Sequence, residues 1–472
     1  MFMRKICLYF FMLSVFCQCV YSQDSQTLRA LSLDALKKLD TVEPVPFTRT
    51  THSDAQWFPE ASFSLFIHWG IHSVAGLEPS WAMMKNCPWQ QDFYEILGWD
   101  PYLGKENYYK LLKEFNPPNY DPDKWIKAAA EAGMRYAVIT TKHHDGYALW
   151  PSEYGELSTK QYMDGRDLLR PFVDACRKYG LKVGFYFSPR DWGYPGYSQS
   201  MDYKKPFEFP HGWTNEKNQE AFDRFYEYTT GQLSELLTRY GDIDLIWFDG
   251  MGWQGIDDIR TEKTLAWVRM IQPHIVINPR WGGKGDFTTP EGFMPDEPPE
   301  GWWENCVSWS GHWGYSPHAP FMPDSWVLEK LVKIRSWGGN LLLNIGPAGD
   351  GSMRPEYYEG LSRIGKWMDL CGESIIGADG IRNWYSFSNV PVTRRAGVWY
   401  LHALPSHEGS ITLEGVPKPQ KIEMLNFNVP ITWFTYDEKT QKLSINVSMT
   451  MRDNLDNVMK VYWDEEPDMQ VK

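Results

Sequence analysis

Short apolar runs along the chain end, one after another, in polar and aromatic residues that are poor material for a hydrophobic core. The run 136–139 leads directly into Thr-Thr-Lys-His-His-Asp-Gly at 140–146, which sets two histidines beside an aspartate. An apolar run of this length that ends so abruptly is typical of a buried strand. Other apolar runs reach a polar residue in the same way, at His68, Ser188, Asp249, Asn278 and Asn344. We therefore expect a set of strands whose ends supply the side chains of one site.

Amphipathic segments separate these strands. In residues 123–133, Trp125 and Ala129 recur with the helical period, and residues 166–179 and 221–240 repeat the pattern. Strands that alternate with helices indicate a parallel sheet. Strand ends that converge on one site are how a (β/α)8 barrel builds its functional face. The predicted fold class is therefore α/β, with a (β/α)8-like barrel of the TIM type.

Three stretches depart from this alternation. Residues 28–39 form a polar, helical lead-in, and residues 282–301 are rich in glycine, proline and acids, which predicts a long surface loop. After about Ile381, short alternating runs separated by turns predict a small antiparallel β-sandwich. The expected divisions are a signal peptide in residues 1–22, the lead-in and barrel in residues 23–380, and the sandwich in residues 381–472.

The first 22 residues have the form of a signal peptide. Arg4 and Lys5 precede an apolar stretch at 6–16, and a small residue, Ser22, ends the segment. Elsewhere no apolar run approaches the roughly 20 residues that span a bilayer. We therefore expect export, to the periplasm or out of the cell, without a membrane span.

Charge and cysteine content narrow the class of ligand. The formal net charge of −13 becomes −15 without Arg4 and Lys5, which argues against nucleic acid and anionic membranes and favours a neutral or cationic ligand. Four cysteines follow the leader, far apart and without a CxxC pair: Cys87, Cys176, Cys306 and Cys371. Buried thiols are expected rather than a disulfide framework, although export would permit a bridge.

The 24 tryptophans are explained equally well by stacking on sugar rings and by an aromatic core. If the ligand is a sugar, a retaining cleavage needs two carboxyl groups about 5–5.5 Å apart. Asp249 is one candidate, because an acid directly after a buried strand needs a partner or a function; a salt bridge at the barrel rim is the alternative. The second acid would come from another loop, and Glu291 and Glu304 are the best-placed candidates.

The histidines allow two interpretations. Adjacent strand residues point to opposite faces, so His143 and His144 could bind one metal only if the backbone has left the strand. No HxH or HExxH pattern accompanies them. Hydrogen bonding to hydroxyl groups is therefore favoured, and we expect no metal and no cofactor. A Ser-His-Asp mechanism has no support, since the GxSxG motif is absent from the sequence.

Four motifs, in order along the chain, carry a resemblance to a known family. They are Phe-Ile-His-Trp-Gly at 66–70, Thr-Lys-His-His-Asp-Gly at 141–146, Trp-Phe-Asp-Gly at 247–250 and Asn-Leu-Leu-Leu-Asn-Ile-Gly-Pro at 340–347. In sequence and order they resemble the α-L-fucosidases of glycoside hydrolase family 29, over about residues 57–376. The resemblance implies a retaining, exo-acting α-L-fucosidase that releases terminal L-fucose from glycans by double displacement.

The resemblance also implies a role for each candidate side chain. Asp249 corresponds to the catalytic nucleophile. Glu291 corresponds to the general acid/base of several bacterial members, and Glu304 is the alternative acid/base. The residues expected to contact the sugar are His68, Trp81, His143, His144, Tyr186, Trp247, Arg280 and Trp313.

One position departs from the family pattern. Many members have Glu-Trp where this chain has Ser80-Trp81, and Glu78 lies two residues earlier. The departure leaves two alternatives open: an α-L-galactosidase, whose substrate differs from fucose by a hydroxyl at C6, and a non-catalytic fucose-binding barrel. In each case the partner is a fucosylated or L-galactose-containing glycan and not a nucleic acid. Linkage preference and homo-oligomer formation are left open.

Overall fold

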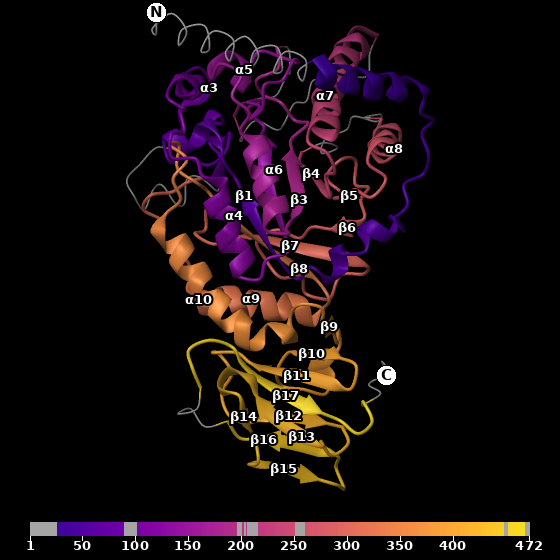
Figure 1. Ribbon diagram of the computed structural model, residues 1–472, viewed down its shortest axis with the longest axis vertical. Helices are drawn as coiled ribbons and strands as arrows, with labels where there is room; N and C mark the ends of the chain where they lie inside the picture. Colours follow the sequence, from indigo (N-terminus) through magenta and orange to yellow (C-terminus); the bar gives the residue numbers. More distant parts are fainter. Residues whose placement is uncertain are drawn as a thin grey trace, which may run out of the picture.

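The structure is a computed structural model of the 472-residue chain. It describes residues 26–88, 102–195, 201–202, 204, 216–250, 260–447 and 452–467. The expected signal peptide, residues 1–22, lies outside the described residues. Within the described residues, no helix is both long enough and apolar enough to cross a membrane. Figure 1 shows a larger barrel domain with a smaller domain of strands beneath it.

Eight parallel strands form the sheet of the larger domain (Figure 1). They are β1 (Phe63–Ile67), β2 (Tyr136–Lys142), β3 (Lys182–Phe187), β4 (Leu245–Phe248), β5 (Val276–Ile277), β6 (Phe287–Thr288), β7 (Trp302–Ser308) and β8 (Asn340–Ile345). Their hydrogen-bonded order is β5-β4-β3-β2-β1-β8-β7-β6. Leu65 of β1 is in register with Ala137 of β2 on one side and with Leu343 of β8 on the other. The first and last strands are therefore neighbours, which confirms the (β/α)8-like barrel.

The remaining seam, between β5 and β6, is joined by one residue, Asp286. No ladder links these two strands in the part of the chain that the structure describes. Instead, the Asp286 N–H donates to the Ile277 carbonyl at 2.7 Å, and Asp286 Oδ2 accepts the Ile277 N–H at 2.8 Å. Asp286 Oδ1 accepts the Thr50 N–H at 2.7 Å and pairs with Arg269. The buried carboxylate is thus satisfied while it closes the barrel.

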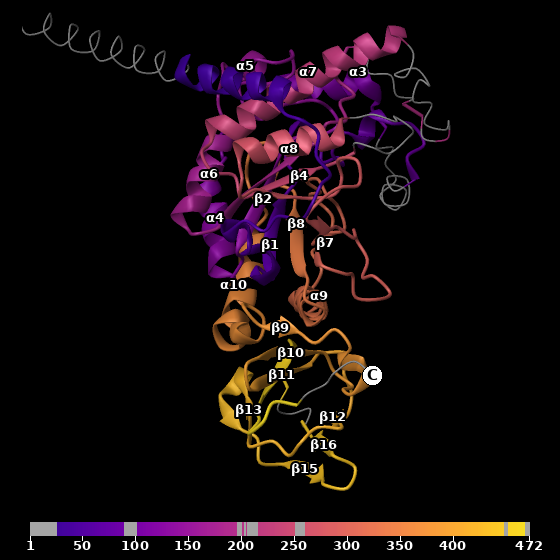
Figure 2. The same cartoon turned by 90° about the vertical axis from the view of Figure 1, so that its right-hand side faces the viewer.

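Helices cover the outside of the barrel (Figure 2). They are the helix at 26–41, α3 (Gly104–Tyr108), α4 (Pro122–Glu131), α5 (Thr159–Tyr162), α6 (Leu169–Lys178), α7 (Glu216–Arg239), α8 (Thr261–Ile271), α9 (Asp324–Ser336) and α10 (Pro355–Cys371). α4 begins where Asp121 accepts the Lys124 N–H at 3.1 Å, which satisfies a donor of the first turn. The predicted helices 123–133, 166–179 and 221–240 correspond to α4, α6 and α7.

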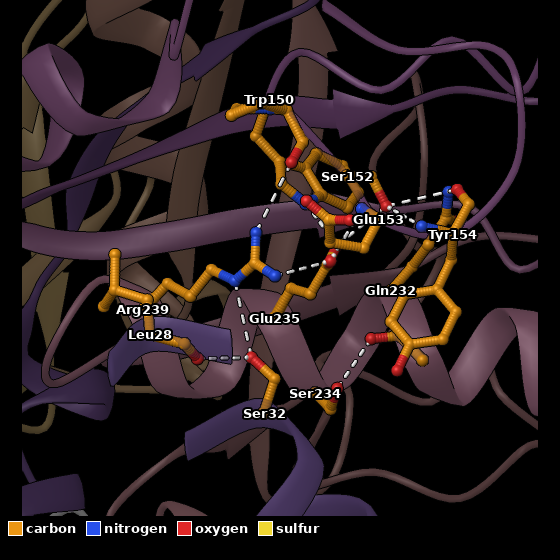
Figure 3. A network of polar contacts seen from close by, with 12 residues as sticks. Leu28, Ser32, Trp150, Ser152, Glu153, Tyr154, Gln232, Ser234, Glu235 and Arg239 are labelled. Atoms are coloured by element: carbon orange, nitrogen blue, oxygen red, sulfur yellow. Dashed lines mark hydrogen bonds and ion pairs between the residues drawn. The ribbon is translucent and has the colours of Figure 1, made fainter. Parts of the chain in front are cut away.

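A buried polar network anchors the N-terminal helix to the barrel (Figure 3). Glu235 of α7 is fully buried, and it accepts the Trp150 Nε1–H at 2.8 Å and pairs with Arg239 at 2.7 Å. Arg239 also donates to the Ser32 hydroxyl at 3.4 Å, and Ser32 donates to the Leu28 carbonyl at 3.1 Å. These partners compensate a carboxylate that would otherwise be costly to bury.

The structure corrects three local expectations. Residues 140–142 continue β2 rather than following it, because they pair with β3. The segment 282–301, expected to be a loop throughout, contains the short strand β6. The hydrophobic pattern also does not predict β7, and Glu304, expected in a loop, lies within this strand. Polar side chains inside a barrel can be stabilised by hydrogen bonds to one another, so the strand that carries them need not be apolar. The hydrophobic pattern therefore does not predict this strand.

The smaller domain consists of two antiparallel sheets, with the orders β14-β13-β17-β11-β10-β9 and β12-β16-β15. Their strands are β9 (Asp379–Gly380), β10 (Val392–Arg395), β11 (Val398–Ala403), β12 (Ile411–Glu414), β13 (Lys421–Met424), β14 (Val429–Pro430), β15 (Phe434–Asp437), β16 (Lys442–Ile445) and β17 (Asn457–Tyr462). Trp399 and Val461 of the larger sheet and Leu413 and Leu443 of the smaller one share a single buried core. Two sheets packed over one core confirm the β-sandwich.

Tryptophans lie both in the core and at the cavity of this fold. Trp125, Trp267 and Trp303 are fully buried in the main hydrophobic core of the larger domain. Trp81 and Trp313 instead line the cavity described below. Each of the four cysteines after residue 22 is a buried thiol, and they form no disulfide with one another, as expected.

Candidate active site

A cavity of about 430 Å³ opens at the carboxyl ends of the barrel strands, where (β/α)8 barrels carry their active sites. Its lining consists of Phe66, His68, Glu78, Pro79, Trp81, His143, His144, Tyr186, Arg190, Trp247, Asp249, Gly250, Arg280, Glu291, Cys306, Gly311 and Trp313. Every sugar-contacting residue expected from the sequence is in this lining, together with Asp249 and Glu291. Glu304 is not in it.

Asp249 directly follows β4 and faces the cavity with its side chain about 20% exposed. The Tyr186 hydroxyl donates to Asp249 Oδ2 at 2.9 Å, and Arg280 Nη1 donates to Oδ1 at 3.1 Å. Burial by itself would raise the pKa of this carboxyl. The positive charge of Arg280 and the two hydrogen bonds outweigh burial, so the pKa lies below its ordinary value. Asp249 is therefore held as a carboxylate.

Arg280 bridges the two candidate acids. While Nη1 holds Asp249, Nη2 donates to Glu291 Oε2 at 2.7 Å. Nε donates to the Thr289 hydroxyl at 3.2 Å, and the guanidinium lies over the Trp247 ring, 4.4 Å from its centroid. Although burial opposes it, the charges of Asp249 and Glu291 raise the pKa of Arg280. One fixed cation therefore sets the position of both carboxyl groups.

Glu291 combines attachment to the barrel with access to solvent. It lies between β6 and β7, and a parallel bridge joins it to Cys306 of β7. The Gly292 N–H also donates to the Cys306 carbonyl, at 2.9 Å. The Glu291 side chain is nevertheless 42% exposed. A carboxyl group in this position can exchange protons with water while it remains at the cavity.

His68 and His144 are held so that each offers a hydrogen-bond acceptor. His68 Nδ1 lies 2.7 Å from Asn344 Oδ1, an oxygen that only accepts, so Nδ1 carries the proton. His144 Nδ1 lies 2.6 Å from Ser188 Oγ, whose own proton goes to the Arg190 carbonyl at 2.8 Å. Burial lowers the pKa of His68 to about 4 and that of His144 well below its ordinary value. Both rings are neutral at pH 7, which leaves Nε2 free to accept from a hydroxyl group.

Ser80 positions the third histidine. Its Oγ lies 2.6 Å from His143 Nδ1 and also accepts the Asp145 N–H at 2.8 Å. The Ser80 N–H donates to the Tyr108 hydroxyl at 3.0 Å, and its φ of +63° is uncommon for a residue other than glycine. The serine that departs from the family pattern is therefore committed to holding His143.

Glu78, two residues before Ser80, also lines the cavity. Its carboxylate accepts the Trp313 N–H at 3.1 Å and the Gly314 N–H at 3.2 Å, and it lies 2.9 Å from His312 Nδ1. These contacts use its oxygens to fix the loop that carries Trp313. Glu78 thus lines the cavity and holds the wall that Trp313 forms.

Aromatic rings form the apolar side of the cavity. Tyr186 and Trp247 are stacked, with centroids 5.5 Å apart and an interplanar angle of 18°. Phe66 lies against Trp247 at 5.2 Å, and Trp313 lies 5.2 Å from the His68 ring. A site with acceptors on one side and aromatic faces on the other matches the two faces of a pyranose ring.

Glu304 lies one layer deeper in the barrel, fully buried. Its neighbour two residues on, Cys306, lines the cavity, whereas Glu304 does not. The Tyr136 hydroxyl and the Trp247 Nε1–H donate to its two oxygens, the latter at 3.0 Å. Burial outweighs these hydrogen bonds and raises the pKa of Glu304 to about 7. Glu304 is therefore a largely neutral acid in a mildly acidic medium.

A metal site could be built only from His143, His144 and Asp249, among the residues that the structure describes. These three groups offer ligand atoms within 4.8 Å of one another. However, Arg280 already donates to Asp249, and a guanidinium beside the carboxylate opposes a second cation. The expectation that this site works without a metal stays a prediction.

Sequence reasoning identified the groups that face the cavity but not the groups that hold them. Ser188 and Asn344 are among the polar residues that end the apolar runs, so the sequence pattern marks both of them. The pattern does not show which histidine each one contacts. Ser80 is marked only by its departure from the family pattern. Arg190 and Cys306 also line the cavity without an expected role.

A (β/α)8 barrel that carries an ionised carboxylate, a second acid and neutral, hydroxyl-binding histidines at its carboxyl face has the form of a glycoside hydrolase. A sequence model of the α-L-fucosidase family matches residues 39–373, most of the chain. The chain therefore belongs to the α-L-fucosidases, glycoside hydrolase family 29.

Individual relatives agree with this assignment. The chain is 29% identical to mouse (Mus musculus) tissue α-L-fucosidase over 404 residues, 80% of this chain and 84% of the relative. It is 33% identical to the Bos taurus enzyme over 337 residues, 68% of each. Among solved structures, α-L-fucosidase isoenzyme 1 from Paenibacillus thiaminolyticus aligns with a TM-score of 0.73 and 31% identity, over 88% of this chain and 99% of that one.

A second solved structure carries chemical information about its own protein. It is a family 29 α-L-fucosidase from Bacteroides thetaiotaomicron, trapped as a covalent intermediate in complex with 2-fluoro-fucosyl fluoride. It aligns with a TM-score of 0.72 and 25% identity, over 89% of this chain and 98% of that one. Together these comparisons confirm the family, the barrel and the enzyme class that the sequence predicts.

The raised pKa of Glu304 predicts how the free energy of unfolding depends on pH. A carboxyl whose folded pKa is about 7 instead of 4.5 favours folding below pH 4.5, and this contribution is lost as the pH rises through 7. Glu304→Gln does not titrate. The free energy of unfolding of wild type relative to Glu304→Gln should therefore fall by roughly 3 kcal/mol between pH 5 and pH 8. Denaturant unfolding of both proteins measures this difference, and parallel pH profiles would contradict a raised pKa.

Proposed function

We propose that this protein is a retaining, exo-acting α-L-fucosidase in which Asp249 is the nucleophile and Glu291 the general acid/base. The observation that carries the proposal is the pairing of one cation with both acids. Arg280 holds Asp249 at 3.1 Å and Glu291 at 2.7 Å, so both carboxyl groups face the same cavity. The short separation required for double displacement fits two acids bridged by a single guanidinium.

In the first step, an Asp249 oxygen attacks the anomeric carbon of a terminal L-fucose. The glycosidic bond breaks, and the proton of Glu291 goes to the leaving oxygen. In the second step, ionised Glu291 takes a proton from water, whose oxygen attacks the anomeric carbon and releases Asp249. The stereochemistry inverts twice and is therefore retained overall.

Accessibility favours Glu291 over Glu304 as the acid/base. The second step needs water, and the Glu291 side chain is 42% exposed at the cavity. Glu304 is fully buried, and its two oxygens accept from Tyr136 and Trp247. A group in that position would have to break these hydrogen bonds to meet a glycosidic oxygen.

The substrate is a fucosylated glycan, recognised through its hydroxyl groups and its apolar face. Neutral His68 and His144 accept from hydroxyls, while Phe66 and Trp313 provide apolar surface for the C6 methyl group. We further propose that residues 1–22 direct export to the periplasm or beyond, where such glycans are encountered.

The nucleophile is tested by a covalent trap. A 2-fluoro-fucosyl fluoride should add one fluorofucosyl mass to wild type, with Asp249 as the modified residue in a peptide map. Asp249→Ala should lose about a thousandfold or more in kcat, keep its melting temperature within a few degrees and form no adduct. Azide should partly restore it and give the β-fucosyl azide, since only one displacement then occurs. Fucose binding by wild type without adduct or hydrolysis would instead establish a sugar-binding barrel.

The acid/base is tested by leaving group and by azide. Glu291→Ala should slow the first step mainly for poor leaving groups, because a good one needs little protonation. Azide needs no general base, so it should accelerate the second step and give the α-fucosyl azide. Glu297→Ala, which removes an exposed acid of the same segment, is the control and should behave as wild type. If azide restores the activity of Glu304→Ala and not that of Glu291→Ala, Glu304 is the acid/base and Glu291 is not.

The C6 position decides between the two candidate substrates. An apolar wall favours a methyl group, but an apolar pocket rejects an added hydroxyl by only about a hundredfold. Matched aryl α-L-fucoside and aryl α-L-galactoside should therefore differ by up to this factor in kcat/KM, with the fucoside preferred. A higher kcat/KM for the galactoside would overturn the substrate assignment.

A further inference from the structure

Glu304 is an acid of the barrel interior that the proposed mechanism does not use. It belongs to β7, is fully buried and is absent from the cavity lining. Its side chain joins two residues of the barrel interior, because Tyr136 donates to one oxygen and the Trp247 indole to the other. Tyr136 is itself fully buried at the start of β2.

Packing alone does not account for a carboxyl group at this depth. Two donors that face a buried acceptor could be replaced, together with that acceptor, by apolar groups of similar shape at little cost in stability. The Tyr136 hydroxyl and the Trp247 indole, which donate to Glu304, are neutral donors, and burial raises its pKa to about 7. The group is thus a neutral acid in a mildly acidic medium, and its carboxyl oxygens serve as fixed acceptors.

The indole that Glu304 holds is the central support of the cavity. One side of Trp247 stacks on Tyr186, which donates to Asp249. The guanidinium of Arg280, which holds Asp249 and Glu291, rests over the same ring at 4.4 Å. Both side chains that contact the proposed nucleophile therefore pack against the Trp247 ring.

We propose that Glu304 is a positioning residue: it fixes the rotation of the Trp247 indole and thereby the placement of Arg280 and Tyr186 around Asp249. This inference rests on the proposed function of the cavity. An indole has two flat orientations that occupy nearly the same space, and only one directs Nε1 at Glu304. The hydrogen bond selects that orientation. A displacement of about 1 Å in a catalytic group can cost a hundredfold in rate, so selection of one orientation matters to catalysis.

Two substitutions separate this role from that of an acid/base. Glu304→Gln keeps an acceptor oxygen for Trp247 Nε1 and should retain kcat within about threefold at pH 6. Glu304→Leu removes the acceptor and should lower kcat about tenfold to a hundredfold, with a smaller change in KM. Azide should restore neither variant. Rates are measured on an aryl α-L-fucoside and normalised to the fraction of protein that 2-fluoro-fucosyl fluoride labels.

Tyr136→Phe is the matched control, since it removes the donor on the other oxygen of the same carboxyl group. It should keep kcat within about threefold, because the bond to Trp247 remains. A double-mutant cycle adds the direct test. If Glu304 acts through the indole, Glu304→Leu should have little further effect on kcat in a Trp247→Phe background. If the two substitutions lower kcat multiplicatively, the proposal is wrong. It is also wrong if Glu304→Gln loses its activity and azide restores it.

If Glu304→Leu does not fold, Glu304→Asp replaces it. The shorter side chain keeps the acid but cannot reach Nε1. A lower kcat for Glu304→Asp with a retained kcat for Glu304→Gln therefore supports the positioning role. A retained kcat for Glu304→Asp with a lower kcat for Glu304→Gln overturns it. Failure of the proposed function is seen separately, as an absence of fucoside hydrolysis by wild type. Calorimetric titration with L-fucose then gives the same comparison among variants, since a misplaced Trp247 should weaken binding.

Discussion

The site depends on one electrostatic constraint: two carboxyl groups must share a cavity lined largely by aromatic rings, in a chain with a formal charge of −13. Two such acids repel each other and lose hydration. The Arg280 guanidinium compensates both, and its planar shape lets separate nitrogens hold separate acids. Burial by itself raises the pKa of Asp249, and the charge of Arg280 is the largest effect that lowers it. A lysine could supply the charge but not this geometry.

Burial is the main cause that keeps the surrounding histidines neutral, because it lowers their pKa values. The positive charges of Arg190 and Arg280 lower the pKa of His144 further. Neutral imidazoles bind hydroxyl groups without competing for the Asp249 carboxylate. In the proposed function, the permanent charge of Arg280 holds the two acids, and the uncharged histidines bind the hydroxyl groups of the ligand.

The barrel and most of the cavity lining could be predicted because they follow from local pattern. Apolar runs that stop at His68 or Asp249 predict both a strand and the site residue at its end, and the motif order identifies the family. The features that the sequence did not predict share one cause. β7 carries Glu304 and Asn305 in its middle, and its polar residues are stabilised by partners distant in sequence, so no local pattern reports it. The role of Ser80 is likewise a matter of three-dimensional contact, 63 residues from His143.

The seam at Asp286 has a consequence for how this enzyme could diversify. Everywhere else along the barrel wall, neighbouring strands share a ladder, so a change in one shifts the register of the next. Between β5 and β6 a single residue, Asp286, makes the join through its N–H and its carboxylate. The segment 279–291, which brings Arg280 and Glu291 to the cavity, is attached at this seam. The length of the turn between Arg280 and Asp286 can therefore change without a slip in the register of a strand pair, and this part of the wall is where the enzyme can most readily change shape.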